Sequence, residues 1–207
     1  ALRPDKLLEE YEADTIRYFM LREVPFGQDG DFSYTALKHR YNTELANDIG
    51  NLLNRSLSML HKYQAGVIAA CGREQEEDRA LVAAVEAMQR GVDEAIGRQA
   101  FHLALEQIQS VVRHGNRYVE ESTPWTLFKQ GEQARLATVL YHLVESLRLI
   151  VLQLSPFMPH KCEEMLAQIL NQAVLTDDLR MATHGGWGLL AEGHECARPS
   201  PVFPRME

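Results

Sequence analysis

The sequence has few of the features that mark secreted, membrane and metal-binding proteins. Its three cysteines, Cys71, Cys162 and Cys196, lie far apart and form no CxxC pair, so neither a zinc knuckle nor a disulfide framework is indicated. No uninterrupted apolar run approaches the roughly 20 residues that cross a bilayer. The first residues, "ALRPDKLLEE", contain no basic stretch leading into an apolar one, so no signal peptide is expected. A reducing, cytoplasmic setting away from membranes is the simplest interpretation.

Motifs of self-contained active sites are also missing. The sequence has no GxSxG, no HExxH and no Cys/His signature of a hydrolase. The turn "FGQDGDFS" lacks the closing Glu of a calcium loop and the Lys of a phosphate loop. His160 and His194 each lie two residues before a cysteine, which provides too few ligands for a tight metal site. We therefore expect no catalytic residue and no metal site in these 207 residues.

Helical periodicity runs through most of the chain, and no strand pattern of any length precedes the tail. The spacing predicts one or two short helices within 4–20, one or two more over 34–64, and single helices over 79–96, 98–119, 126–154 and 155–170. Asp14 and Ser33 are expected to cap helices, and Gly66 to stop one. A turn or short hairpin is expected near Gly27, and an irregular tail from Thr176. The fold class is therefore all-α, an antiparallel helical bundle with two less regular ends.

A polar stripe stands out on the predicted helix over 34–64. Asn47, Asn51 and Arg55 are spaced i, i+4 and i+8, so they line up on one face. Asn is a poor residue inside a helix, because its side chain competes for backbone groups. One explanation is recognition, since amides and guanidinium groups hydrogen-bond the edges of unstacked bases. The other is a solvated or interhelical polar face, and the spacing leaves both open.

The stretch "ESTPW" raises the same two alternatives for a tryptophan. Ser122 and Thr123 are good N-cap residues and Pro124 suits the first helical position, so Trp125 falls in the first turn of a new helix. Most tryptophans are largely buried, which favours a place in the core. A position beside a loop favours a platform for stacked bases. The net charge of −8 argues against a general nucleic-acid binder, but a local groove of cations is compatible with it. The cations of this groove would be Arg55, Lys62, Arg113, His114, Arg117 and Lys129, and Glu120 and Glu121 would oppose them.

Five segments of the chain closely resemble the C-terminal part of methionyl-tRNA synthetases, and they occur in the same order. They are "ADTIRYFMLREVPFGQDGDFS", "RYNTELANDIGNLLNRSLSML", "YVEESTPWTLFK", "LSPFMPHKCEEM" and "PVFPRME". The resemblance covers essentially the whole chain and is least distinctive around "REQEEDRALVAAVEAM". It implies a helical bundle of the class Ia anticodon-binding type.

The resemblance also implies a division of the chain and a role for its residues. Residues 1–32 would be the connecting, stem-contact-like segment after the KMSKS loop, 33–172 the anticodon-binding bundle, and 173–207 a tail that packs back on the catalytic body. Asn51, Arg55 and Trp125 would read the CAU anticodon of tRNA(Met), with Asn47 at a neighbouring position of the same stripe. The catalytic part, where it is present, should then cover several apolar tail residues, namely Trp187, Leu189, Leu190, Val202 and Phe203. Without the catalytic part the tail should be mobile.

The chain also departs from a complete synthetase of this family. It carries no HIGH or KMSKS motif, so the expected function is anticodon recognition within a methionine–tRNA ligase, with no catalysis by this fragment alone. ATP with magnesium and methionine would be used by the parent enzyme, and no cofactor is expected in the fragment. The partners implied are the tRNA(Met) anticodon loop and the catalytic domain of the same enzyme. A monomer is expected. The alternatives are a bundle whose Asn/Arg face binds protein, and the same bundle in a related class I synthetase.

Overall fold

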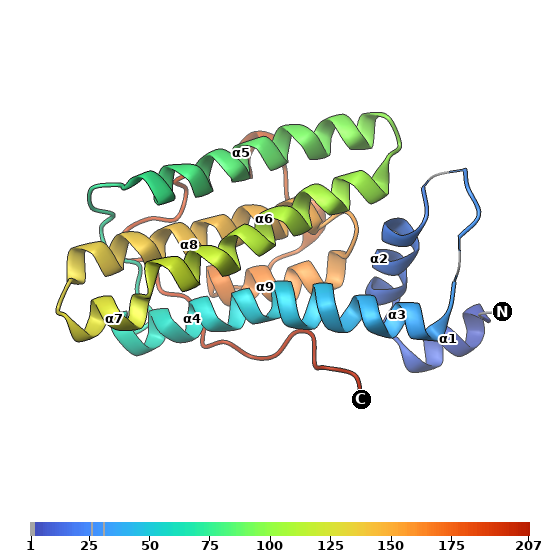
Figure 1. Ribbon diagram of the computed structural model, residues 1–207, viewed down its shortest axis with the longest axis horizontal. Coiled ribbons are helices and arrows are strands. Elements are labelled where there is room, and N and C mark those ends of the chain that lie inside the picture. Colours follow the sequence, from blue (N-terminus) through green and yellow to red (C-terminus); the bar gives the residue numbers. More distant parts are fainter. Residues whose placement is uncertain (1–2, 26, 31) are drawn as a thin grey trace.

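The protein is a long helical bundle with a small helical extension at one end (Figure 1). The computed structural model describes residues 3–25, 27–30 and 32–207. Its helices are α1 (Pro4–Glu10), α2 (Ala13–Glu23), α3 (Tyr34–Arg40), the π-helix η1 (Tyr41–Gly50), α4 (Asn51–Gln64), α5 (Glu76–Gly97), α6 (Phe101–Ser122), α7 (Pro124–Lys129), α8 (Gln133–Leu154), α9 (Pro159–Leu170), the 3-10 turn η2 (Thr176–Asp178) and α10 (Met181–His184). Within the described ranges the only β pairing is an isolated antiparallel bridge between Val67 and Glu195. The predicted all-α fold class is confirmed.

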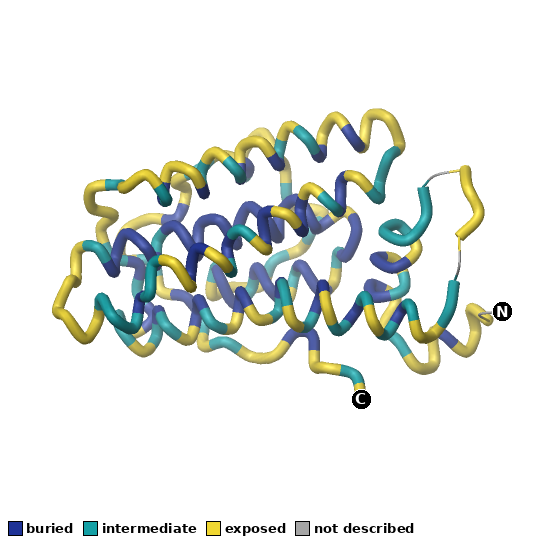
Figure 2. The backbone as a smooth tube through the Cα atoms, viewed as in Figure 1, coloured by how far each residue is buried: buried dark blue, intermediate teal, exposed yellow. Residues whose placement is uncertain are grey.

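The helix α8 is the centre of the bundle. It packs against α4, α5, α6, α7 and α9, and Figure 2 shows it as an almost continuously buried ribbon inside the more exposed neighbours. It is long and apolar enough to cross a membrane, but 94% of its apolar window is buried inside the protein, so its composition reflects its place in the core. Each fully buried Leu, Ile or Val contributes roughly 1.5–3 kcal/mol relative to exposure. Gly115 lets α6 approach closely, because a Cβ there would lie 2.8 Å from the Leu52 side chain of α4.

Several helix ends follow the predicted capping chemistry. The Ser33 hydroxyl accepts a hydrogen bond from the amide of Ala36 at 3.1 Å. Helix α4 ends at Gln64, where Ala65 is left-handed with φ 54° and Gly66 follows with φ 83°. The caps of Ser33 and Gly66 are thus confirmed.

The predicted cap by Asp14 is wrong. Helix α2 begins at Ala13, so Asp14 lies inside its first turn. The Asp14 carboxylate instead accepts a hydrogen bond from the amide of Lys161, the third residue of α9, at 2.7 Å. It therefore satisfies a free amide at the start of a different helix, and it joins the N-terminal extension to the bundle.

The segment between α2 and α3 is a turn. Gly27 has φ 81°, and the amide of Gln28 donates to the carbonyl of Pro25 at 3.0 Å. Phe26 and Asp31, which belong to the predicted turn or hairpin, lie outside the described residues. The extension has a small core of its own, in which Leu7, Phe19 and Leu37 are buried.

The predicted helix over 34–64 is continuous, but its middle third is a π-helix. Over Tyr41–Gly50 the backbone follows the wider i→i+5 winding, which is rare and frequently found at functional sites. A side chain at Gly50 would lie 2.9 Å from the carbonyl oxygen of Leu45, so glycine fits this close approach. The carbonyl of Asp48 accepts from the side chain of Asn116 on α6 at 3.1 Å. The wide turns are therefore fastened to the bundle.

The tail lies against the bundle rather than apart from it. Figure 1 shows its last residues running alongside α4. Leu190, Val202 and Phe203 are buried at 5%, 4% and 5% exposure, whereas Leu189 stays 53% exposed. The expectation that a catalytic part covers the first three is wrong, because the chain's own core covers them. The backbone of the tail is also bonded: the Lys161 ammonium donates to the carbonyl of Val202 at 3.1 Å.

Candidate nucleic-acid interface

The polar stripe lies along the π-helix and α4. Asn47 and Asn51 are exposed and Arg55 is half-buried. Asn51 and Arg55 lie one turn apart in α4, whereas Asn47 lies in the π-helix, whose winding is wider. The stripe is nevertheless brought to one surface of the molecule, because Asn47 and Asn51 line the same groove.

The other wall of this groove comes from the end of the chain. Pro201, Val202 and Phe203 face Asn47 and Asn51 across it. The tail is held there by a reciprocal pair of hydrogen bonds, because the Asn42 amide group donates to the carbonyl of Met206 at 3.0 Å and accepts from its N–H at 2.9 Å. The aromatic ring of Phe203 also meets Tyr41 edge to face at 6.1 Å.

Sequence reasoning missed this second wall. The signal that could have found it is the apolar pair Val202 and Phe203 enclosed by two prolines, in a segment otherwise classed as irregular. A cleft beyond Asn47 adds cations: it is lined by Lys38, His39 and Arg205 together with Tyr11 and Tyr34. Among the described residues none of these three cations has an ion-pair partner within 4 Å.

Arg55 connects the stripe to the end of α6. Its guanidinium donates to the Glu120 carboxylate at 2.7 Å, and the two side chains are 30% and 60% exposed. Exposed ion pairs of this kind contribute about 0–1 kcal/mol. The guanidinium can therefore exchange this carboxylate for another acceptor, such as a base edge or a phosphate, at little cost.

Trp125 lies just beyond the same end of α6. Helix α6 ends at Ser122, Thr123 is left-handed with φ 45°, and Pro124 occupies the first position of the six-residue α7. Pro124 is placed as predicted, but the predicted side-chain cap is wrong: Thr123 is the N-cap residue and its side chain makes no capping hydrogen bond. The indole of Trp125 is half-buried and packs against the main core. Part of this side chain therefore lies in the core and part faces solvent, which leaves both alternatives open.

A buried carboxylate fixes the helices on either side of α7. Asp78 at the start of α5 is 0% exposed, and it accepts hydrogen bonds from the Tyr118 hydroxyl of α6 and from the Arg135 guanidinium of α8. It also accepts from the amide of Gln75 at 2.8 Å. Burial alone would raise the pKa of Asp78, but the hydrogen bonds from Arg135, Gln75 and Tyr118 outweigh it and hold this pKa below its ordinary value. We call these three side chains, Asp78, Tyr118 and Arg135, the α7 clamp.

The predicted groove of cations is largely neutralised. Besides Arg55, Arg113 pairs with Glu106 at 2.7 Å and Arg117 approaches Glu121 at 3.9 Å. Burial lowers the pKa of His114, and Arg117 lowers it further while Glu121 opposes the shift. Lys62 and Lys129 are exposed, and neither belongs to an ion pair in the described part of the chain. Of the predicted groove, the positive charge free to meet phosphates therefore lies at the α4–α7 corner.

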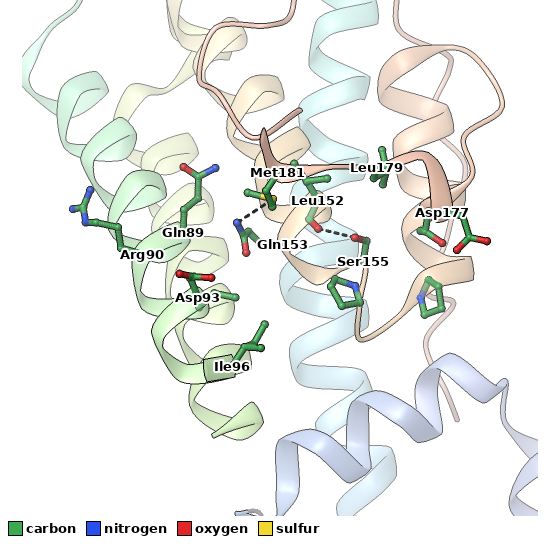
Figure 3. Close-up of a pocket in the computed structure, with 14 residues that line it drawn as sticks. Gln89, Arg90, Asp93, Ile96, Leu152, Gln153, Ser155, Asp177, Leu179 and Met181 are labelled. Atoms are coloured by element: carbon green, nitrogen blue, oxygen red, sulfur yellow. Dashed lines mark hydrogen bonds between the residues drawn. The ribbon is translucent and has the colours of Figure 1, made fainter. Parts of the chain in front are cut away.

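A further cleft lies apart from the stripe. Figure 3 shows it between α5, the end of α8 and the tail, where Asp93 and Ile96 face Gln153 and Met181. It contains none of the predicted site residues. No three His, Cys, Asp or Glu side chains in the ranges that the structure describes are placed to hold a metal ion. The polar stripe and the α4–α7 corner remain the candidate site.

Comparison with known proteins identifies the class first. Residues 1–57, which include the whole stripe, match the family model "tRNA synthetases class I (M)". The fold and the match together define a part of a class I aminoacyl-tRNA synthetase.

The rest of the chain specifies the family. Residues 68–207 match the model "Anticodon binding domain of methionyl tRNA ligase". Methionine–tRNA ligases of Caldanaerobacter subterraneus and Rhizobium meliloti are each 42% identical over 99% and 98% of this chain. The apo methionyl-tRNA synthetase of Mycobacterium tuberculosis is 38% identical, superposes with a TM-score of 0.91 and is matched over 100% of this chain. The chain belongs to the methionyl-tRNA ligase family and contains its anticodon-binding domain.

The relatives are considerably longer than this chain. It spans 32% and 38% of the two ligases, and 41% of the solved synthetase. A second structure of the M. tuberculosis enzyme, with a TM-score of 0.90, is described as a complex with methionyl-adenylate.

Proposed function

We propose that this chain reads the CAU anticodon of tRNA(Met) for a methionine–tRNA ligase. The observation that carries the proposal is the arrangement at the end of α6, where Arg55 of α4 reaches Glu120 and the half-buried Trp125 follows on α7. Adjoining elements therefore present the exposed amide of Asn51, the guanidinium of Arg55, whose carboxylate partner can be replaced, and the indole of Trp125. These are the groups that recognise splayed-out single-stranded bases.

In this proposal the three side chains have different tasks. The indole of Trp125 provides a stacking face, which is tolerant of base identity. The amide of Asn51 carries both donors and an acceptor, so it suits the Watson–Crick edge of cytosine or adenine, and Arg55 supplies donors to carbonyl oxygens of a pyrimidine. Asn47 extends the same surface toward the cationic cleft. Base identity would therefore be read by Asn51 and Arg55, and affinity supplied by Trp125.

The rest of the parent reaction belongs to residues outside this chain. We propose that adenylation of methionine with ATP and magnesium, and its transfer to tRNA, take place in the part of the relatives that this chain does not span. Residues 1–32 would then connect to that part, 33–172 would form the anticodon-binding bundle, and the exposed portion of 173–207, such as Leu189, would face the catalytic body. Support for the contact is the 53% exposure of Leu189 in a tail that is otherwise bonded to the bundle.

We also propose a monomer that works in the cytoplasm. Support for a reducing compartment is that Cys71, Cys162 and Cys196 are all free, two of them buried. Support for a monomer is that large exposed apolar side chains are scattered over α1, α2, α3, α5, α6, α7 and the tail. Light scattering of the purified chain tests the second point.

The experiment is a binding assay with anticodon stem-loops. Wild-type protein should bind a CAU stem-loop at least tenfold more tightly than one with a mismatched triplet. Trp125→Ala should weaken binding by roughly 5- to 100-fold, because one stacked base is worth about 1–3 kcal/mol. Its matched control is Trp187→Ala, since Trp187 is also half-buried and packed on the core but lies in the tail.

The outcomes separate the alternatives. The two tryptophan variants could lose the same affinity and the same melting temperature. That outcome would show that Trp125 has a purely structural role. A protein-binding module would ignore all stem-loops, and a related class I synthetase would prefer another triplet.

A further inference from the structure

A second aromatic surface lies beside Trp125. Phe128 follows Trp125 by three residues on α7, so the two side chains occupy neighbouring faces of this short helix. The Phe128 ring stacks on Tyr63 at the end of α4, with ring centroids 4.6 Å apart and planes inclined by 25°. Phe128 is 50% exposed, and Tyr63 covers one face of its ring.

The charges around this pair suit a nucleic acid. The Lys62 ammonium lies 5.6 Å from the centroid of the Tyr63 ring, which polarises the stack. Lys129 is exposed next to Phe128, and these are the two lysines of the corner without an ion pair in the described ranges. A half-exposed ring flanked by unpaired cations offers one flat apolar face together with sites for phosphates.

The pair also lies in line with the proposed reading residues. Lys62 follows Arg55 by seven residues on α4, which is two turns along the same face. A strand whose triplet meets Asn51, Arg55 and Trp125 would continue toward this end of α4, where α7 lies beside it (Figure 1).

We propose that Phe128, backed by Tyr63, is a stacking platform for an unpaired loop nucleotide that flanks the anticodon triplet. The inference rests on the proposed function and extends it from the triplet to its neighbour in the loop. Stacking does not distinguish the four bases, so this contact supplies affinity without adding to discrimination between triplets. Removing the ring should therefore lower the binding affinity for all stem-loops by the same factor.

The test compares variants of one position with matched and mismatched stem-loops. Phe128→Ala and Phe128→Leu should each weaken binding of both RNAs by the same factor, roughly 5- to 100-fold, because leucine keeps the apolar area but loses the flat π face. Phe128→Trp should bind as tightly as wild type or more tightly. Leu175→Ala is the control for loss of exposed apolar surface, since Leu175 is 62% exposed and lies between α9 and η2.

Fluorescence identifies the nucleotide. 2-Aminopurine placed on the 5′ or the 3′ side of the triplet should report a stacking change on wild-type binding that disappears at one of the two positions in Phe128→Ala. The platform is overturned if wild type prefers CAU while Phe128→Ala binds within twofold of it, or if Leu175→Ala loses as much. A wild type without preference for CAU would overturn the proposed function, and the platform with it.

Discussion

The two ends of the bundle are held by similar clusters that are built for different purposes. At the junction with the N-terminal extension, the carboxylate of Glu44 accepts from the Tyr18 hydroxyl at 2.5 Å and from Arg22 and Arg40 at 3.2 and 2.7 Å. At the opposite end the α7 clamp repeats the combination of a buried carboxylate, a tyrosine and an arginine. Burial, followed by the neighbouring carboxylate, raises the pKa of Tyr18 and of Tyr118.

The difference lies in what surrounds each cluster. Glu44 binds arginines from α2 and α3, so it joins the extension to the bundle. Asp78 joins the starts of α5 and α8 to the end of α6. Helix α7, with its half-exposed rings, connects α6 to α8. Fixing the flanking helices leaves α7 as the short, exposed element that can present Trp125 and Phe128.

The largest expected effect comes from breaking either cluster. Asp78→Asn and Glu44→Gln each remove a buried negative charge. Arg135 keeps its ion pair with Glu77, and Arg22 and Arg40 keep theirs with Glu106 and Glu23, so each substitution should lower the free energy of unfolding by roughly 1–3 kcal/mol. Chemical denaturation measures this. Well below the melting temperature, only Asp78→Asn should also weaken CAU stem-loop binding, because only this clamp orients the helices around α7. Equal binding losses in the two variants would show that the clamps do not differ in function.

The second expected effect is a pH dependence that belongs to the α7 clamp. The pKa of Asp78 is lowered in the folded state, so its stabilisation is present above the unfolded-state pKa and is lost as pH falls through the lower, folded value. The gap in melting temperature between wild type and Asp78→Asn should therefore be widest near neutral pH and should narrow in the acid range below about pH 4. Scanning calorimetry across this range measures the gap. A gap that stays constant into acid would contradict the charged role of Asp78.

The smallest expected effect concerns the exposed ion pair at the corner. Glu120→Gln frees the Arg55 guanidinium and removes a negative charge near the proposed RNA path, so stem-loop affinity should rise by about two- to fivefold, which is less than 1 kcal/mol. The gain should shrink at high salt because the charge is exposed. Glu94→Gln, which alters an exposed pair with Arg98 at 3.5 Å on another helix, should leave the affinity unchanged. A loss of affinity in Glu120→Gln would mean that Glu120 positions Arg55 instead of competing for it.

Local sequence chemistry predicted much of the fold. The caps at Ser33 and Gly66 and the position of Pro124 depend on neighbouring residues alone, and the structure has them. Asp14 failed because its partner, Lys161, is 147 residues away, and no local pattern contains that contact. The sequence did not predict the π-helix, because its apolar spacing is close to that of an α-helix and Gly50 alone does not indicate the wider turn.

The candidate site was only partly visible in the sequence. The motifs identified Asn51, Arg55 and Trp125, and their roles remain predictions. The groove wall of Val202 and Phe203 forms only because the tail folds back onto residues about 150 positions earlier in the chain. The composition of the tail predicted only an irregular segment. The Tyr63 and Phe128 stack likewise pairs residues that are 65 positions apart in the chain, so it required the packing of α7 on α4.

The π-helix sets an angle as well as a local winding. In an α-helix each residue advances about 100° around the axis, so removing one residue from Tyr41–Gly50 would turn α3 and the extension by about that amount relative to α4. The contacts of α2 with α6 and α9 would then be lost, while Arg55 would keep its place. The length of this segment, counted to the single residue, is therefore what orients the extension against the proposed anticodon-reading face of the bundle.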